Sequence, residues 1–227
     1  MENKFDFRAV IFDMDGTLLD TLEDIADSMN AVLKEMGFPV HNIEAYKAFT
    51  GDGIVPLVER AFPPESRDKE TVQAGVEKMQ KEYTLHWSSK TRPYDGIPEL
   101  LDELVRRRIK MTILSNKLDR FTKLAARKFL SAWSFVQVKG ITPLIPKKPA
   151  PYGALLIARD LGFSPEEFVY IGDTDVDMKT ANAAGMFPVG ALWGFRSREE
   201  LIENGAKVVV ETPLEVLRLF DNGKTIS

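Results

Sequence analysis

The sequence contains no cysteine, and its only histidines are His41 and His86. Without cysteine the chain has no disulfides, no thiolate nucleophile and no Cys-ligated zinc. The two histidines are too few and too isolated to indicate a metal site of their own. Composition therefore excludes enzymes that depend on a thiol and domains that are held together by disulfides or Cys-ligated zinc.

Long apolar runs and a strong charge bias are also missing. No apolar run approaches the roughly 20 residues that a membrane-spanning helix requires, and residues 1–7 lack the apolar centre of a signal peptide. The net charge is only −4 and the basic residues are scattered, so no surface for nucleic acid or an anionic membrane is predicted. We therefore expect a cytoplasmic protein, in which a local positive site is enough to bind a small phosphorylated metabolite.

Short apolar segments alternate with amphipathic helical segments along most of the 227 residues, a length that allows a core domain with an insertion. Strands are predicted at residues 10–12, 110–114, 135–138, 168–171, 186–189 and 207–210. Helices are predicted at residues 97–108, 118–130, 150–161, 176–184, 197–203 and 213–220. This alternation implies right-handed βαβ units and a parallel sheet covered on both faces. Only residues 222–227 are expected to fray.

The segment between the first two of these strands contains helical patterns only. They cover residues 22–36, 42–48, 54–61 and 68–87. Such a block is too long for a simple crossover between strands, and the turn Pro93-Tyr94-Asp95-Gly96 marks the return to the core. We therefore predict two domains, an α/β core from residues 1–20 and 92–227 and an inserted helical cap from residues 21–91.

Polar side chains follow the predicted strands, which is where open α/β sheets place their chemistry. Asp13 and Asp15 follow the first strand, and their side chains point to the same side if the extended path continues. Gly16 then lets the backbone turn away. The other candidates lie after later strands or just before a helix: Ser115, Asn116, Lys148, Asp173 and Asp177.

Each of these clusters has a purely structural alternative. Residues 13–16 can be a polar turn after a strand, and residues 115–116 a helix cap. Lys148 can be a solvated surface charge, Asp173 a cap, and Asp177 a first-turn acid favoured by the helix dipole. Their shared location and complementary chemistry favour one site, with a nucleophile, an acid/base group, phosphate donors, a cation and metal ligands.

Four motifs, in order along the chain, resemble those of the haloacid dehalogenase (HAD) superfamily of phosphotransferases. Residues 13–21 read D-x-D-G-T-L-x-D-T, as in motif I, and residues 113–117, I-L-S-N-K, resemble motif II. Residues 148–151 have the K-P-x-P form of motif III, and residues 172–178 the G-D-(S/T)-x-x-D form of motif IV. The match continues through residues 50–53, 91–96 and 192–195. The chain thus resembles a phosphoglycolate-phosphatase-like member with a helical cap inserted after motif I.

The resemblance implies an α/β fold with a doubly wound, Rossmann-like parallel sheet in the order 5-4-1-2-3 and an inserted all-helical cap. It places the site at the switch between strands one and four, as the general rule for doubly wound sheets also does. It implies Mg²⁺ as the cofactor, held by the Asp13 carboxylate, the Asp15 backbone carbonyl and Asp173, with Asp177 supporting the ion directly or through water. Whether the chain is a monomer or a homodimer stays open.

The same resemblance implies the roles of the two acids in motif I. Asp13 is the nucleophile and forms an aspartyl-phosphate, and Asp15 is the general acid/base that protonates the leaving alkoxide and then activates water. An acid at the position of Asp15 indicates ester phosphate chemistry, because halide-displacing and phosphonate-cleaving relatives lack it.

The other motifs are expected to hold the phosphate. The Ser115 hydroxyl and the Asn116 backbone N–H bind its equatorial oxygens. Lys148 offsets the repulsion between the anionic nucleophile and the anionic phosphate. Lys147 is the rival for this role, but the K-P-x-P register selects Lys148.

The cap is expected to determine the substrate. The loop Thr50-Gly51-Asp52-Gly53 precedes a cap helix and, by analogy with relatives, lies over the active site; the alternative is a helix-start turn. Four residues are candidate partners for a substrate carboxylate, each alternatively an exposed surface residue. They are Lys47, Arg60, His86 and Arg92.

The leading function is Mg²⁺-dependent hydrolysis of small phosphomonoesters, with 2-phosphoglycolate as the first substrate. Pyrophosphatase or sugar phosphomutase activity is the alternative within the superfamily. A mutase must keep water from its phosphoenzyme, and the glycine-flanked loop at residues 50–53 looks more like the phosphatase branch. An alternative of another class is a catalytically retired binding or regulatory module, which predicts decay in at least one motif; none is seen.

Overall fold

A computed structural model describes residues 6–221, so the predictions for residues 1–5 and for the frayed end at residues 222–227 lie outside the described residues. The centre of the molecule is a six-stranded sheet in the order β5-β4-β1-β6-β7-β8. All neighbouring strands in it are parallel. The strands are β1 (Ala9–Phe12), β4 (Lys110–Leu118), β5 (Phe135–Ile141), β6 (Phe168–Gly172), β7 (Phe187–Ala191) and β8 (Val208–Val210).

The α/β class and the parallel sheet are confirmed, but the predicted strand order, 5-4-1-2-3, is incomplete. The sheet has six strands, and numbered among themselves in chain order they run 6-5-4-1-2-3 from the β8 edge. The additional edge strand, β8, has only 3 residues and pairs with β7. The five-strand order implied by the resemblance leaves no place for this strand, although the apolar residues 207–210 predict it from the sequence.

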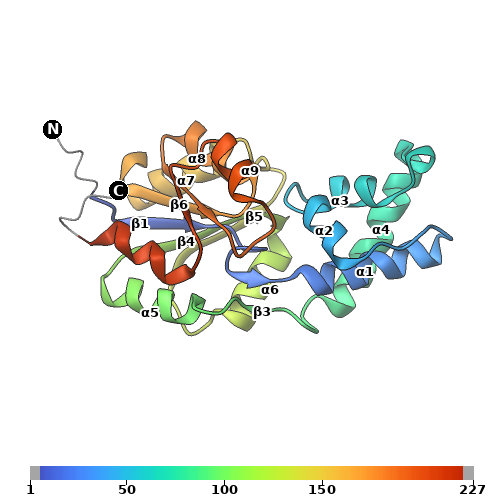
Figure 1. The fold of residues 1–227 in the computed structure, drawn as a ribbon, viewed down its shortest axis with the longest axis horizontal. Helices are drawn as coiled ribbons and strands as arrows, with labels where there is room; N and C mark the ends of the chain where they lie inside the picture. Colours follow the sequence, from blue (N-terminus) through green and yellow to red (C-terminus); the bar gives the residue numbers. More distant parts are fainter. Residues whose placement is uncertain (1–5, 222–227) are drawn as a thin grey trace.

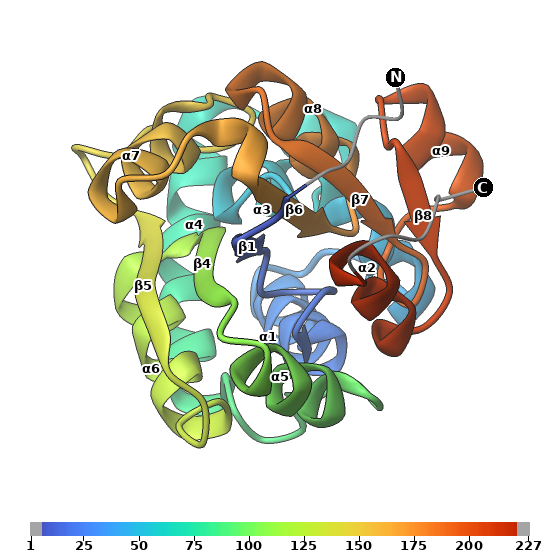
Figure 2. The ribbon, with the colours of Figure 1, turned by 90° about the vertical axis from the view of Figure 1, so that its left-hand side faces the viewer.

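Strand β1 lies in the middle of the sheet, and helices cover both of its faces (Figure 2). Val10 and Phe12 belong to the apolar cluster on the side of α5 and α6, whereas Ala9 and Ile11 belong to the cluster on the side of α7 and α8. Because successive side chains alternate between the faces, a strand covered on both sides reads as one continuous apolar run. The covering helices are α5 (Ile97–Arg106), α6 (Asp119–Phe129), α7 (Tyr152–Leu161), α8 (Asp175–Ala184) and α9 (Arg198–Glu203).

The last described element differs from its prediction. Residues Pro213–Phe220 form a 3₁₀ helix rather than an α-helix, and this helix packs beside α5. Its buried side chains, Pro213, Val216 and Leu219, recur every third residue, which is the period of a 3₁₀ helix. The apolar pattern therefore predicted a helix correctly but not its type.

A helical segment occupies the chain between β1 and β4, and Figure 1 shows it beyond the end of the sheet. Its α-helices are α1 (Leu22–Glu35), α2 (Ile43–Phe49), α3 (Ile54–Ala61) and α4 (Lys69–His86). They enclose an apolar cluster of their own, which includes Met29, Tyr46 and Phe62. Within residues 6–221, no helix is both long enough and apolar enough to cross a membrane.

The chain enters and leaves the helical segment through a small antiparallel ribbon that the sequence did not predict. The ribbon consists of β2 (Leu19–Asp20) and β3 (Arg92–Pro93). Beside it, the buried carboxylate of Asp24 accepts hydrogen bonds from the backbone N–H groups of Lys90 and Thr91, both at 2.9 Å, and from the Thr91 hydroxyl at 2.7 Å. The two connections between the core and the helical segment are therefore hydrogen-bonded to each other at the start of α1.

Candidate active site

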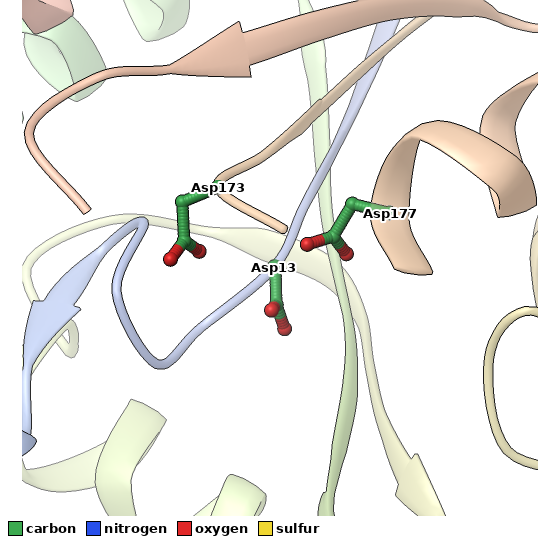
Figure 3. A group of neighbouring side chains, drawn as sticks. All are labelled: Asp13, Asp173 and Asp177. Atoms are coloured by element: carbon green, nitrogen blue, oxygen red, sulfur yellow. The ribbon is translucent and has the colours of Figure 1, made fainter. Parts of the chain in front are cut away.

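Three carboxylates meet at the carboxyl edge of the sheet. Asp13 follows β1, Asp173 follows β6, and Asp177 lies in the first turn of α8. All three are buried, and they offer ligand oxygens that lie within 4.8 Å of one another (Figure 3). Parallel strands end at the same edge, so residues more than 150 positions apart in sequence are neighbours here.

Lys148 completes this cluster. Its Nζ lies 2.9 Å from Asp13 Oδ1 and 2.6 Å from Asp177 Oδ1, and its side chain is only 2% exposed. Its rival Lys147 is exposed and donates to the Asp52 backbone carbonyl at 3.4 Å. The alternative of a solvated charge therefore describes Lys147 and not Lys148.

Asp177 is both a first-turn acid of α8 and a member of the carboxylate cluster. Its Oδ2 accepts hydrogen bonds from the Thr174 N–H at 3.1 Å and the Thr174 hydroxyl at 2.7 Å, which forms a capping box at the start of α8. Its other oxygen faces Lys148. The cap thus fixes the direction in which the second oxygen points.

Asp173 is held by residues from two distant loops. Its Oδ1 accepts a bond from the Thr17 hydroxyl at 2.7 Å, and its Oδ2 accepts one from the Phe195 N–H at 3.0 Å. Gly16 has φ +83°, and a Cβ on it would lie 2.2 Å from Asp173 Oδ2. The glycine of motif I is therefore required both for its backbone conformation and for space. Sequence reasoning gave Thr17 no role, although it lies in the same motif.

Burial and mutual repulsion perturb the ionisation of this cluster. The pKa of Asp13 is raised to about 7, chiefly by burial; the ammonium of Lys148 lowers it, and repulsion from Asp177 and Asp15 raises it. Burial, followed by repulsion from Asp177 and Asp13, raises the pKa of Asp173 well above its usual range. Burial by itself lowers the pKa of Lys148, but Asp13 and Asp177 outweigh it, so that the pKa lies well above its usual range.

The cluster fits a hard divalent cation. Carboxylate oxygens are the donors that Mg²⁺ prefers, and Asp13, Asp173 and Asp177 supply them within one small buried volume. Lys148 is the only cation that contacts these carboxylates in the described part of the chain. Excess negative charge in a buried place is costly, and the raised pKa values of Asp13 and Asp173 are its consequence. A bound Mg²⁺ would offset this charge.

Asp15 has a different partner, which the sequence did not identify. Lys117 Nζ donates to its two carboxylate oxygens at 2.8 Å and 2.9 Å. The Lys117 side chain is 8% exposed and that of Asp15 is 19% exposed, so the pair is largely shielded from water. Lys117 directly follows Asn116 in the motif II segment, and that position was the signal available in the sequence.

Ser115 and Asn116 are buried within β4, which continues to Leu118. The N-cap of α6 is Leu118, without a side-chain bond, so the alternative of a Ser-Asn helix cap is wrong. The Asn116 amide instead joins two loops. Its Oδ1 accepts from the Lys148 N–H at 2.8 Å, and its Nδ2 donates to the carbonyls of Lys148 and Gly51, both at 3.1 Å.

The loop at residues 50–53 lies against the core. Thr50, Gly51 and Gly53 line a pocket together with Asp13 and Asp15, whereas Asp52 pairs with Arg60 outside it. Arg196, a further residue without a predicted role, donates to the Thr50 carbonyl at 2.8 Å and also to the Lys47 carbonyl. Gly53 is also the N-cap of α3, so the loop is a helix start as well.

The four candidate partners for a substrate carboxylate lie elsewhere. Within residues 6–221, none of them is among the residues that line the pocket beside Asp13 and Asp15. Each faces an acidic neighbour at 2.5–3.4 Å instead. The pairs are Lys47 with Glu44, Arg60 with Asp52, His86 with Glu82, and Arg92 with Asp20.

Comparison with known proteins identifies the family. The sequence profile of the haloacid dehalogenase-like hydrolase family matches residues 10–191. A phosphoglycolate phosphatase of Aquifex aeolicus is 30% identical over 215 residues, 95% of this chain and 97% of that protein. A phosphoglycolate phosphatase of Chromobacterium violaceum is 30% identical over 219 residues, again 95% of this chain and 97% of the relative. The chain belongs to the haloacid dehalogenase-like hydrolase family.

The solved structures agree with this assignment. A crystal structure from Lactobacillus delbrueckii subsp. bulgaricus, provisionally assigned as a phosphoglycolate phosphatase, superposes with a TM-score of 0.89 at 29% identity and covers 97% of this chain and 100% of its own. Within the family, the chain is a phosphoric monoester hydrolase. The resemblance stated from the four motifs is therefore confirmed.

Proposed function

We propose that the chain is a Mg²⁺-dependent phosphatase that hydrolyses small phosphomonoesters through an aspartyl-phosphate on Asp13. The proposal also treats residues 1–20 and 92–227 as the core domain and residues 21–91 as the cap. One observation carries it: buried Lys148 lies between Asp13 and Asp177, with Asp173 beside them, at the carboxyl edge of a doubly wound sheet. A buried cation among three acids suits an anionic substrate that must approach an anionic nucleophile.

The contacts of Asp13 suit a nucleophile. Lys148 Nζ and the Met14 N–H, the latter at 2.7 Å, both donate to Oδ1. This leaves Oδ2 as the oxygen that can attack phosphorus. The bond from Oδ2 to phosphorus forms as the ester bond to the leaving oxygen breaks, and the acyl phosphate is then hydrolysed by water.

The metal site is proposed on the same residues. Asp13, Asp173, the Asp15 backbone carbonyl and, directly or through water, Asp177 would hold Mg²⁺, which when bound offsets the charge of the phosphate and of the carboxylates. Thr17 and the Phe195 N–H hold Asp173 in place for this purpose. The Thr174 cap does the same for Asp177.

The remaining roles follow from position. Asp15 would give a proton to the leaving oxygen and later take one from water, with Lys117 fixing the direction of its carboxylate. The Ser115 hydroxyl, the Asn116 backbone N–H and Lys148 would bind the phosphate oxygens. Because the Asn116 amide bonds to Lys148 and Gly51, it couples this phosphate site to the loop at residues 50–53.

The first substrate to test is 2-phosphoglycolate, since relatives that match nearly the whole chain carry that name. The pocket beside Asp13 and Asp15 is bounded by the helical segment and by the loop at residues 50–53. This glycine-flanked loop is the feature that favours the phosphatase branch over a sugar phosphomutase. Pyrophosphate is the remaining small alternative.

Phosphate release from a substrate panel tests the proposal. The panel contains 2-phosphoglycolate, pyrophosphate, hexose phosphates, pyridoxal phosphate and nucleotides, each with Mg²⁺ and with excess EDTA. We expect Mg²⁺-dependent hydrolysis with the highest kcat/KM for 2-phosphoglycolate. A higher kcat/KM for another ester would make that ester the proposed substrate in place of 2-phosphoglycolate. Activity that persists in EDTA would contradict the proposed metal dependence.

A further inference from the structure

The pocket beside Asp13 and Asp15 contains two polar groups that the reaction described above does not use fully. Lys117 and Tyr83 both line it. A lysine ammonium has three N–H donors, and Lys117 directs two bonds to Asp15, at 2.8 Å and 2.9 Å, so one donor remains. The same Nζ lies 4.8 Å from the centroid of the Tyr83 ring. The two groups therefore stand side by side, Lys117 from the core and Tyr83 from α4.

The Tyr83 hydroxyl is an unpartnered buried group. The residue is 6% exposed, and its hydroxyl faces the Lys117 ammonium but forms no hydrogen bond of ordinary geometry with any of the described residues. Buried polar atoms are almost always hydrogen-bonded, because leaving one unpaired costs free energy, so each exception requires an explanation. A ligand group that accepts the hydroxyl proton provides one.

The rest of this part of the pocket is mostly apolar, with Gln80 as a further polar side chain. Ile25, Met79 and Phe121 form apolar walls. Lys117 is the one cationic side chain that lines the pocket within residues 6–221. The Thr50 hydroxyl already donates to the carbonyl of Tyr46 at 2.9 Å. A carboxylate that enters this part of the pocket, beyond the groups of Ser115 and Asn116 proposed to bind the phosphate, therefore has Lys117 as its cationic partner, and low polarity strengthens its hydrogen bonds.

We propose that Tyr83 and Lys117 form a carboxylate subsite that selects phosphomonoesters of 2-hydroxy carboxylic acids; the inference rests on the proposed function. Lys117 holds Asp15, which in the proposed reaction protonates the leaving oxygen. A substrate group that accepts a hydrogen bond from Lys117 must therefore be separated from the leaving oxygen by only a few covalent bonds. A carboxylate on the carbon next to the ester oxygen has this spacing. Its oxygens accept the remaining Lys117 N–H and the Tyr83 O–H. The smallest such ester is 2-phosphoglycolate.

The experiment compares 2-phosphoglycolate with ethyl phosphate, in which a methyl group replaces the carboxylate. The ratio of their kcat/KM values is measured with Mg²⁺ for the wild type and for Tyr83→Phe, Lys117→Met and Tyr46→Phe. The last is a matched control, because Tyr46 is a buried tyrosine of the same helical segment whose hydroxyl donates to Asn30 at 2.7 Å. We expect the ratio to fall about 10-fold in Tyr83→Phe and about 100-fold in Lys117→Met. These factors match the usual contribution of one hydrogen bond to a charged group.

The outcomes separate this inference from the proposed function. The Tyr46→Phe ratio should equal that of the wild type. An unchanged ratio in Tyr83→Phe, with Mg²⁺-dependent hydrolysis retained, overturns the subsite and leaves the phosphatase in place. No Mg²⁺-dependent hydrolysis of any ester by the wild type contradicts the proposed function and the subsite with it. Tyr83→Phe removes only this hydroxyl, so the melting temperature of the variant should not fall. The ratio of kcat/KM values in Tyr83→Phe therefore tests the subsite even if Lys117→Met does not fold.

Discussion

Asp13 and Asp15 stand two residues apart, yet each is paired with a different lysine. Lys148 and the Met14 N–H act on a single oxygen of Asp13. Lys117 holds both oxygens of Asp15. One carboxylate therefore keeps an oxygen for bond formation, while the other is oriented as a whole. This difference in contacts suits the division of labour that we propose, a nucleophile beside a proton carrier.

The two carboxylates should be separable by substitution. Asp13→Asn is expected to abolish turnover, because an amide is a poor nucleophile. Asp15→Asn is expected to lower kcat about 10²- to 10⁴-fold, the usual contribution of a general acid/base group. Steady-state kinetics of the two variants on the best substrate make the comparison. Near wild-type turnover by Asp13→Asn would refute its role.

Gly16 provides a second test at the level of one residue. Gly16→Ala should lose Mg²⁺ activation, since the new methyl group would lie 2.2 Å from Asp173 Oδ2. Gly37→Ala is the matched control, because Gly37 also has a positive φ, +74°, but no atom of residues 6–221 lies within 4 Å of its added Cβ. Both variants should lose about 1–3 kcal/mol of stability from backbone strain. Titration of the initial rate with Mg²⁺ distinguishes them, and equal Mg²⁺ dependence would show that the contact with Asp173 is unimportant.

At the scale of elements, long periodic segments were predictable and short or polar ones were not. Helix α3 has the predicted bounds, and α4 is one residue shorter at each end. The ribbon of β2 and β3 has 2 residues in each strand, too few to show a period. Strand β4 continues through Ser115 and Asn116 to Leu118. Its polar side chains break the apolar pattern there, so the sequence did not predict this part of the strand. Apolar alternation reports burial, so it reaches only as far as the apolar core.

The same limit explains what could be predicted of the site. The carboxylates and Lys148 stand in motifs with fixed spacing, so their grouping at one edge follows from the fold. Lys117 stands at the end of motif II, but its partner Asp15 comes from a distant segment. Arg196 and Tyr83 are isolated residues, and nothing in their local sequence distinguishes them from ordinary surface or core residues. Their positions become evident only when α4 and the loop after β7 are placed against the core.

Asp24 should anchor the helical segment to the core. Its carboxylate accepts from both Lys90 and Thr91, so Asp24→Asn is expected to cost about 1–3 kcal/mol, the loss for buried groups left unpaired. Asp27→Asn on the same helix is the control, because Asp27 is 61% exposed and pairs with Lys90 Nζ at the surface; its effect should stay below about 1 kcal/mol. Urea unfolding of both variants measures the difference. Equal free energies of unfolding for the two variants would mean that Asp24 does not link the two connections between the core and the helical segment.

At the scale of the molecule, the pocket beside Asp13 is lined by both the core edge and the helical segment, and we propose that the metal ion binds at the core edge. Mg²⁺ demands octahedral geometry, whereas Ca²⁺ accepts about six to eight ligands and often binds a carboxylate through both oxygens. A bound Ca²⁺ would be able to take both carboxylate oxygens of Asp13, which would leave none for attack on phosphorus. We therefore expect Ca²⁺ to bind without supporting turnover and to compete with Mg²⁺, and Asp173→Ala to weaken both ions. Initial rates against Mg²⁺ at fixed Ca²⁺ concentrations test this, and equal turnover with Ca²⁺ alone would contradict it.

The covalent intermediate is the most direct test of the whole account. Excess enzyme is mixed with radiolabelled 2-phosphoglycolate and Mg²⁺, quenched in acid within one turnover, and digested so that the labelled peptide can be sequenced by mass spectrometry. The account predicts phosphate on Asp13, none on Asp13→Asn, and loss of the label on longer incubation as water hydrolyses the acyl phosphate. Phosphate on any other residue, or an equal label on Asp13→Asn, would contradict it.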